Sequence, residues 1–349
     1  MNSSHSAPSR RPLVLPPNQL HRFYLGGPAI AELRGIPSED PQAPEDWVGS
    51  ATAEWGSSTA GLARFEDGTI LRDAMANDPE DFFGPEHADR FGGDPGVLVK
   101  ILDAGQRLPV HFHPDVPFAR RHLGLNHGKT EAWVIVTTST PDAAVWVGWQ
   151  DDIDPATAAT WVETQSTDVM LDALHRFPVE PGDTLFLPGG MPHAIGEGIL
   201  LVELQEPTDL SILMEWEGFD IDGAADGHLG LGFDLALQAL DRAGWDRAQL
   251  ADETVAPPEP VVDRPGAWRL FPKAADGFFR AERIRPAPET AIPAEFSILV
   301  VIAGEGRLTT ASGGSLGVTR GATVLVPFAA GEAELSGTLD VLRCMSPVP

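Results

Sequence analysis

Val110-His111-Phe112-His113-Pro114-Asp115 is the stretch of this sequence that says most about the fold. Two histidines separated by one residue point to the same face of a β-strand, because side chains on a strand alternate with a period of two. The β-rich run from Gly96 to Ala104 leads straight into this stretch. The pattern therefore predicts two imidazoles side by side on one wall of a β-rich unit.

A carboxylate and a third histidine follow on further apolar segments. Glu131 precedes the strand-like residues 132–136, and His193 ends a strand-and-turn pattern that begins at Gly182. Imidazole and carboxylate ligands that converge from rigid strands suit a divalent metal ion. If these strands neighbour each other in one small barrel, the side chains form a metal site with positions open to a substrate. The predicted ligands are His111, His113, Glu131 and His193.

The composition is that of a globular chain with many turns. Of 349 residues, 36 are Gly and 32 are Pro, which favours short strands over long helices. No apolar run approaches the roughly 20 residues that span a bilayer. Residues 1–12 are polar and predict a disordered tail. Because Cys344 is the only cysteine, no internal disulfide can form, and we expect a cytoplasmic protein.

The formal net charge of −27 argues against nucleic acid or an anionic membrane as a partner, since both require a basic face. It also makes the few cations informative. The chain has three lysines, and two of them, Lys100 and Lys129, flank the candidate metal motifs. The alternative is that both are ordinary solvated lysines near these motifs by chance.

The order of apolar runs, turns and helical patterns predicts a mainly β chain with two β-barrel units. Gly182-x5-Pro188-x4-His193 has a counterpart in Gly321-x5-Pro327-x4-Glu332, which suggests a second barrel without histidines. Because Gly-apolar-Pro is a common pattern, chance similarity is the alternative. The predicted parts are a tail (1–12), a metal-binding domain (13–217), a mainly helical segment (218–252), a Pro-rich linker (253–266) and a degenerate barrel (267–349).

Several separated blocks resemble type I mannose-6-phosphate isomerases of the cupin superfamily, in their short bacterial form. The blocks are 99–104, 108–115, 128–133 and 182–195. The resemblance implies a bicupin with a mainly helical insertion. It also implies a metal-dependent enzyme that interconverts mannose 6-phosphate and fructose 6-phosphate. Zn is the expected ion, with Mn, Fe, Ni and Co as alternatives.

The resemblance also implies roles for individual residues. It makes His113, Glu131 and His193 metal ligands. It places three catalytic candidates at the substrate: Lys100, Lys129 and Glu203. Isomerisation moves a proton between C1 and C2 through an enediol, so the site needs a proton carrier and a stabiliser of negative charge. Lys129 is a candidate for the first task, or alternatively for binding an oxyanion.

Three positions depart from the family pattern. His111 stands where the family usually has Gln, Pro109 replaces a phosphate-contacting Ser, and Leu213 replaces an Arg. The last two changes remove charge-assisted contacts of the kind that hold a phosphate. Candidates to replace the lost cation from nearby loops are Arg107, Arg120 and Arg121.

These observations favour a sugar-phosphate isomerase and leave two alternatives. One is a related metal-cupin enzyme that acts on an unphosphorylated or modified sugar, which Pro109 and Leu213 motivate. The other is a non-catalytic sugar-binding cupin that keeps the metal for its shape. In each case the partner is a small sugar or sugar phosphate.

Overall fold

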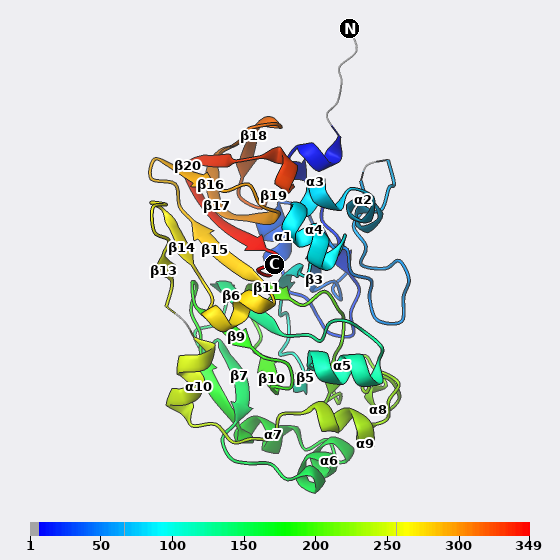
Figure 1. Cartoon of the computed structure of the whole chain (residues 1–349). Coiled ribbons are helices and arrows are strands. Elements are labelled where there is room, and N and C mark those ends of the chain that lie inside the picture. The colour runs from blue at the N-terminus through cyan, green and yellow to red at the C-terminus, as the bar shows by residue number, and fades with distance from the viewer. Residues whose placement is uncertain (1–6, 66, 256) are drawn as a thin grey trace.

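The computed structural model of this chain describes residues 7–65, 67–255 and 257–349. Two β-sheet units are stacked in Figure 1, with the histidine-bearing unit in the lower half and the C-terminal strands in the upper half. The prediction of a mainly β chain with two barrels and helical insertions is confirmed.

The lower unit, here called the metal barrel, consists of two antiparallel sheets. The first has the order β2 (Gln19–Leu20), β3 (Glu45–Val48), β4 (Leu98–Asp103), β11 (Ile199–Gln205), β6 (Glu131–Thr138) and β9 (Thr184–Leu187). The second has the order β12 (Ile212–Leu213), β5 (His111–Phe112), β10 (His193–Ile195), β7 (Ala144–Trp149) and β8 (Leu174–Pro178).

Strands β4 and β11 are buried on both faces, which explains their nearly continuous apolar sequence. Leu102 and Leu201 pair across the two strands and pack inside the metal barrel. The next pair, Ile101 and Val202, points the other way and packs against the C-terminal unit. Alternate residues of one strand therefore serve two different cores.

The upper unit, here called the C-terminal barrel, is built on one nine-stranded antiparallel sheet. Its main path is β1 (Leu13–Val14), β19 (Thr323–Val326), β17 (Ser297–Thr310), β20 (Ala333–Met345), β15 (Arg280–Ile284), β14 (Ala267–Arg269) and β13 (Glu259–Pro260). Off this path, β16 (Glu289–Ile292) pairs with β20 and β18 (Gly314–Thr319) pairs with β17.

Two features of the structure, strand β1 and the N-terminal tail, concern the predicted domain boundaries, which remain a prediction. Strand β1 lies in the range assigned to the metal-binding domain but pairs with β19 of the C-terminal barrel, Leu13 opposite Leu325. Of the predicted tail, residues 1–6 lie outside the described residues. The 3-10 helix η1 (Pro8–Arg10) shows that the rest of that tail is ordered, because Ser9 is buried and bonds to Asp81.

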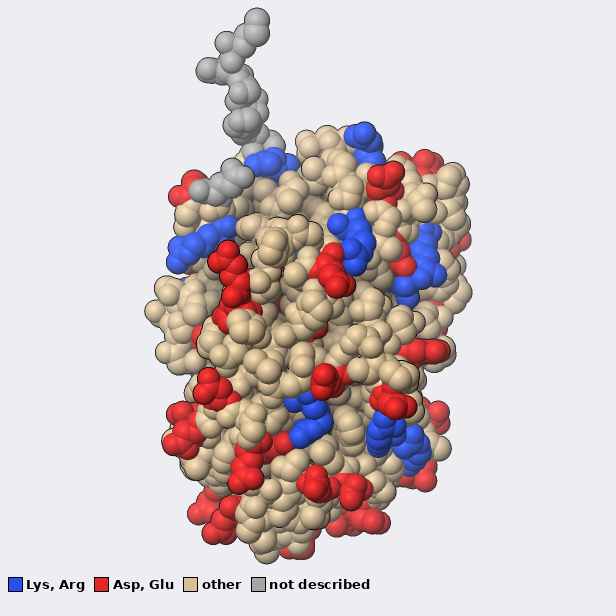
Figure 2. Space-filling view, turned by 180° about the vertical axis from the view of Figure 1, so that it is seen from behind, with Lys and Arg blue, Asp and Glu red and all other residues tan. Residues whose placement is uncertain are grey.

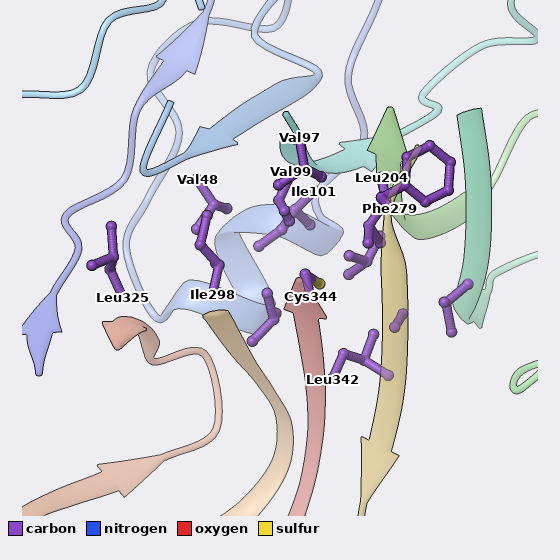
Figure 3. Packing of buried hydrophobic residues seen from close by; sticks show 14 of the residues in the cluster. Val48, Val97, Val99, Ile101, Leu204, Phe279, Ile298, Leu325, Leu342 and Cys344 are labelled. Carbon is purple, nitrogen blue, oxygen red and sulfur yellow. The ribbon is translucent and has the colours of Figure 1, made fainter. Parts of the chain in front are cut away.

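The two units share a hydrophobic core, which Figure 3 shows at close range. Val99 and Ile101 of the metal barrel face Ile298, Leu342 and Cys344 of the C-terminal barrel. All of these side chains are almost completely buried. Covering this much apolar surface is strongly favourable and fixes the two barrels against each other.

The helices surround the sheets and are short. Before β4 they are α1 (Ala29–Arg34), α2 (Leu71–Asn77), α3 (Pro79–Phe83) and α4 (Pro85–Phe91). Within and after the metal barrel they are α5 (Val116–His122), α6 (Pro155–Glu163), α7 (Thr167–Ala173), α8 (Gly223–Asp226), α9 (Phe233–Ala236), η2 (Leu237–Ala239) and α10 (Arg247–Thr254). The C-terminal barrel adds η3 (Lys273–Gly277) and η4 (Phe328–Ala330).

Acidic side chains dominate the lower part of the face shown in Figure 2. Figure 2 shows Asp and Glu spread over the half that contains the metal barrel, while Lys and Arg are more frequent in the upper half. Among the described residues, no helix has the length and apolar character needed to cross a membrane.

Candidate metal centre

Strand pairing brings the predicted ligands together. His111 on β5 lies directly opposite His193 on β10 in the antiparallel register. One ring nitrogen from each of His111, His113 and His193 lies within 4.8 Å of the others. Glu131, at the start of β6 on the facing sheet, places its carboxylate oxygens 3.0 Å from His113 Nε2 and 3.2 Å from His193 Nε2.

The turn between β9 and β10 explains how the third histidine meets the other two. Gly190 donates its backbone N–H to the His113 carbonyl at 2.6 Å. A Cβ atom on Gly189 would lie 2.8 Å from the Asp115 Cα, so only glycine permits this approach. Asp115 in turn caps α5 by accepting from Phe118 N at 2.8 Å. The Gly-Gly pair thus locks the turn against the histidine segment.

Each imidazole is oriented by a backbone carbonyl at its far side. This contact makes Nδ1 the protonated nitrogen and leaves Nε2 with a free lone pair, as in metal-binding histidines. The contacts join Nδ1 of His111, His113 and His193 to the carbonyl oxygens of Pro109, Leu210 and Met191, at 2.8, 2.7 and 2.9 Å.

The protonation states also fit a cation. Burial, together with the Lys129 ammonium, lowers the pKa of His113 to about 3. Burial likewise lowers the pKa values of His111 and His193, so all three rings are neutral at pH 7. The carboxyl of Glu131 is ionised, because the neighbouring His113 and Lys129 outweigh the effect of burial and hold its pKa well below the ordinary value.

Within the described residues, three atoms at the centre of this group are buried without a hydrogen-bond partner. They are His113 Nε2, His193 Nε2 and Glu131 Oε2. Such unsatisfied acceptors cost free energy unless something fills the space between them. Three neutral imidazoles and one carboxylate, all with lone pairs directed inward, fit a divalent metal ion.

A second polar row lies on the facing sheet, where Lys100 of β4 pairs with Glu203 of β11. Lys100 Nζ lies 3.3 Å from Glu203 Oε1, 3.4 Å from Glu45 Oε2 and 4.9 Å from the centre of the Trp47 ring. Although burial opposes its charge, the carboxylates of Glu45 and Glu203 raise the pKa of Lys100 above its ordinary value. Lys100 is therefore a fixed cation.

Glu203 differs from its neighbour Glu45 in its acidity. Burial raises the pKa of Glu203 above its ordinary value, and Lys100 offsets this only in part. For Glu45, burial is outweighed by Arg22 and Lys100, and its pKa is lowered. Glu203 Oε1 is buried without a hydrogen-bond partner within the described residues. A carboxyl with a raised pKa beside a cavity has the character of a proton carrier.

The four candidate ligands His111, His113, Glu131 and His193 are here called the metal group. Lys129 reaches it from the loop before β6. Its Nζ lies 3.5 Å from Glu131 Oε2, and the side chain is buried. Glu206 holds this loop by accepting from Gly128 N at 3.2 Å and Thr130 N at 2.9 Å. The sequence motif thus places an ammonium group next to a ligand carboxylate.

A narrow cavity of about 30 Å³ joins the metal group to the second polar row. His111 of the five-stranded sheet lines it together with Lys100, Lys129, Glu131 and Glu203 from the six-stranded sheet and the loop before β6. On this measure one water molecule needs roughly 10–15 Å³, so the space holds a few waters at most. All of the predicted catalytic candidates face it.

Two of the atypical positions, Pro109 and Leu213, also line this cavity. The three arginines named as candidates to compensate for them do not line the cavity. Arg107 binds Glu215 through two hydrogen bonds, and Arg120 and Arg121 are exposed on α5. Arg22 is the one arginine among the described residues that line the cavity.

Sequence reasoning missed four residues of this wall: Arg22, Tyr24, Glu45 and Ser211. Tyr24 donates its hydroxyl to Glu45 Oε1, and Glu45 also accepts from Trp47 Nε1 at 2.6 Å. One signal was available, because the Glu-x-Trp spacing places Glu45 and Trp47 on one face of a strand. The pairing of β3 with β4, which brings them to Lys100, is non-local.

Comparisons with known proteins find mannose-6-phosphate isomerases. No family model matches the chain. The mannose-6-phosphate isomerase ManA of Bacillus subtilis is 28% identical over 337 residues, covering 95% of this chain and 98% of that protein. The mannose-6-phosphate isomerase of Streptococcus mutans is 25% identical over 344 residues, with 94% and 96% covered.

Solved structures show the same fold. The mannose 6-phosphate isomerase from Bacillus subtilis superposes with a TM-score of 0.71 at 22% identity, over 96% of this chain and 99% of that chain. A phosphomannose isomerase mutant from Salmonella typhimurium also gives a TM-score of 0.71, at 16% identity over 97% and 100%. Over nearly its whole length, the chain is similar in sequence and fold to mannose-6-phosphate isomerases of type I, which are cupins.

Proposed function

We propose that this chain is a metal-dependent aldose–ketose isomerase that catalyses the reaction its relatives are named for, the interconversion of mannose 6-phosphate and fructose 6-phosphate. The observation that carries the proposal is the convergence of three neutral imidazoles and the Glu131 carboxylate beside a cavity lined by Lys100, Lys129 and Glu203. We expect Zn²⁺ as the natural ion and a cytoplasmic location without nucleic-acid partners.

The reaction moves two protons. In the open-chain aldose, C2 loses a proton and O1 gains one, which gives the enediol. O2 then loses its proton and C1 gains one, which gives the ketose. A divalent ion held by His111, His113, Glu131 and His193 would supply Lewis-acid stabilisation of the negative charge on the sugar oxygens.

We assign the carbon-bound proton to Glu203. Its carboxyl is buried and has a raised pKa, and its Oε1 makes no hydrogen bond within the described residues although Lys100 Nζ lies 3.3 Å away, which are properties of a proton carrier. Lys100, fixed between two carboxylates, orients Glu203 and donates to a substrate oxygen. Lys129 stabilises the developing oxyanion from the side of Glu131.

Metal analysis followed by an isomerase assay tests the proposal. The purified chain is expected to bind one divalent ion and to convert mannose 6-phosphate to fructose 6-phosphate in a coupled assay. Glu203→Gln is expected to keep the metal and to lower kcat by about 10²–10⁴-fold. A metal-loaded protein that converts neither mannose 6-phosphate nor free mannose would reject the proposal and favour a non-catalytic sugar-binding cupin.

A further inference from the structure

A wider hollow of about 330 Å³ at the surface lies next to the narrow cavity at the metal group. Four residues border both spaces: Arg22, Phe23, Ser211 and Leu213. The inner space alone is too small for a hexose. A sugar with C1 and C2 at the metal group must therefore extend its other end past these four residues into the hollow.

Leu213 lies between the narrow cavity and the hollow, where the end of the sugar remote from C1 would pass. It lies opposite His111 in the β12–β5 pair, so both side chains project from the same face of the sheet. It is 3% exposed. Its side chain has no hydrogen-bonding group and no charge. The boundary beside the metal group is thus apolar on this side.

The cations near the boundary are already committed to carboxylates. Arg22 lies 2.8 Å from Glu54, 3.2 Å from Asp209 and 3.6 Å from Glu45. Lys100 and Lys129 lie 3.3–3.5 Å from the carboxylates described above. A phosphate dianion would have to compete with these groups for each positive charge.

Negative charge predominates along the whole path. Three carboxylates line the inner cavity, and four more line the hollow, where the exposed Asp220 and Asp226 lie. The permanent cations along both spaces are Arg22, Lys100 and Lys129. Even with a bound divalent ion and with Glu203 protonated, the path keeps a net negative charge. A dianion entering it is repelled, whereas sugar hydroxyls can donate hydrogen bonds to these carboxylates.

We infer that this site prefers a sugar whose end remote from C1 is an uncharged alcohol over the same sugar phosphorylated there. The inference rests on the proposed isomerase function and specifies the substrate class of that site. Mannose 6-phosphate is then a substrate that the metal group can turn over but that the hollow binds poorly. The selectivity arises from Leu213, which lies between the two spaces, and from the carboxylates that line the hollow.

The first test compares two substrates on the full-length, metal-loaded protein. The kcat/KM values for mannose and for mannose 6-phosphate are measured at low ionic strength by following ketose formation. The value for mannose is expected to equal or exceed that for mannose 6-phosphate. A higher value for mannose 6-phosphate overturns the inference but supports the isomerase function, whereas no turnover of either sugar rejects that function.

Leu213→Arg tests the boundary directly. A guanidinium at this position is expected to raise the ratio of kcat/KM for mannose 6-phosphate to that for mannose by about tenfold or more, because it supplies a charge-assisted contact to phosphate. Leu213→Gln, which is polar and uncharged, is expected to change the ratio by less than about threefold. Equal ratios in both variants and the wild type would contradict the role of charge here.

Asp226→Lys tests the hollow without disturbing a buried position, because Asp226 is exposed. The same ratio is expected to rise about threefold, and the rise is expected to disappear at about 1 M salt, where the Debye length is ~3 Å. Asp252→Lys on α10 makes the same change of charge outside the hollow and is expected to leave the ratio unchanged. If both variants change the ratio equally, the selectivity does not arise in the hollow.

Discussion

The two barrels use one architecture for opposite interiors. Inside the C-terminal barrel most side chains are apolar, as with Leu299, Val301 and Val341, each at most 1% exposed, and the buried Arg343 is paired with Glu282. Inside the metal barrel, a comparable row across the five-stranded sheet contains His111 and His193. The buried charge of the C-terminal barrel is thus paired, with Arg343 beside Glu282, whereas the histidines of the metal barrel have buried nitrogens without a hydrogen-bond partner among the described residues. Such unsatisfied atoms indicate a binding function.

The matched motifs make the difference specific. After Pro188 the chain turns and enters β10 at His193, which is buried and points to the metal group. After Pro327 it forms η4, and Glu332 precedes β20 in an exposed position. Burying neutral rings and a carboxylate with unsatisfied atoms costs stability, and a bound cation offsets that cost.

The largest expected effect comes from breaking the metal group. His193→Ala should abolish stoichiometric metal binding and lower kcat/KM by roughly 10³-fold or more, because a bound metal contributes several kcal/mol to catalysis. Elemental analysis of the purified protein and steady-state kinetics measure both effects. Glu332→Ala, at the matched position of the C-terminal barrel, should change neither. A metal content unaffected by His193→Ala would contradict the assigned centre.

The reverse experiment removes packing from the C-terminal barrel. Leu299→Ala should lower the free energy of unfolding by about 2–5 kcal/mol, because it leaves a cavity in a closed apolar interior. The metal content per folded chain should stay the same. Urea denaturation gives the stability change, and Val262→Ala, at an 82% exposed position, serves as the control. Loss of metal in Leu299→Ala would show that the barrels are not functionally separate.

The sequence predicted the metal barrel better than its surroundings, for a physical reason. Part of the ligand set follows from local rules, since the His-x-His spacing places His111 and His113 on one face, whereas the convergence of His193 and Glu131 with them depends on the packing of distant strands. The wall formed by Arg22 and Glu45 depends on pairings between distant strands, which local patterns do not encode. The same limit applies to β1, whose partner β19 lies about 310 residues away along the chain.

The loop arginines named as candidates to replace the lost cation do not line the cavity, for a related reason. Proximity in sequence placed Arg107 near the histidines, but its guanidinium is held by Glu215. Glu215 also accepts from Val110 N at 2.8 Å, so the pair anchors the start of β5. Arg107 thus stabilises the start of β5 through Glu215.

That anchor provides a smaller test of the metal barrel. Glu215→Gln should cost about 1–3 kcal/mol of stability, because a buried charge-assisted pair with Arg107 is lost. It should also weaken metal binding about tenfold by loosening β5, as outer-shell changes do. Denaturation and competitive metal titration measure the two effects. Glu217→Gln, at an exposed position on the same segment, is the control. Equal metal affinity in both variants would contradict the anchoring role.

The smallest expected effect concerns the loop that carries Lys129 and Glu131 in the metal barrel. His127 lies on this loop, and its Nε2 is 2.7 Å from Oδ2 of Asp94, which follows α4. Although burial opposes the charge, Asp94 and Glu206 raise the pKa of His127 from 6.5 to about 9. The folded-state pKa is higher than the unfolded-state value, so folding favours the protonated ring.

The sign of the pH dependence follows from this difference. The stabilisation is fully present below about pH 6.5 and is lost as the pH rises through 9. At saturating metal, His127→Gln should therefore lower the free energy of unfolding by ~1 kcal/mol at pH 6 and have little effect at pH 10, as expected for a partly exposed pair. His122→Gln, which removes a ring packed on Phe118, is the control for the loss of ring packing. A His127→Gln effect that stays constant from pH 6 to pH 10 would mean that the ring supports the ligand-bearing loop by packing and not by charge.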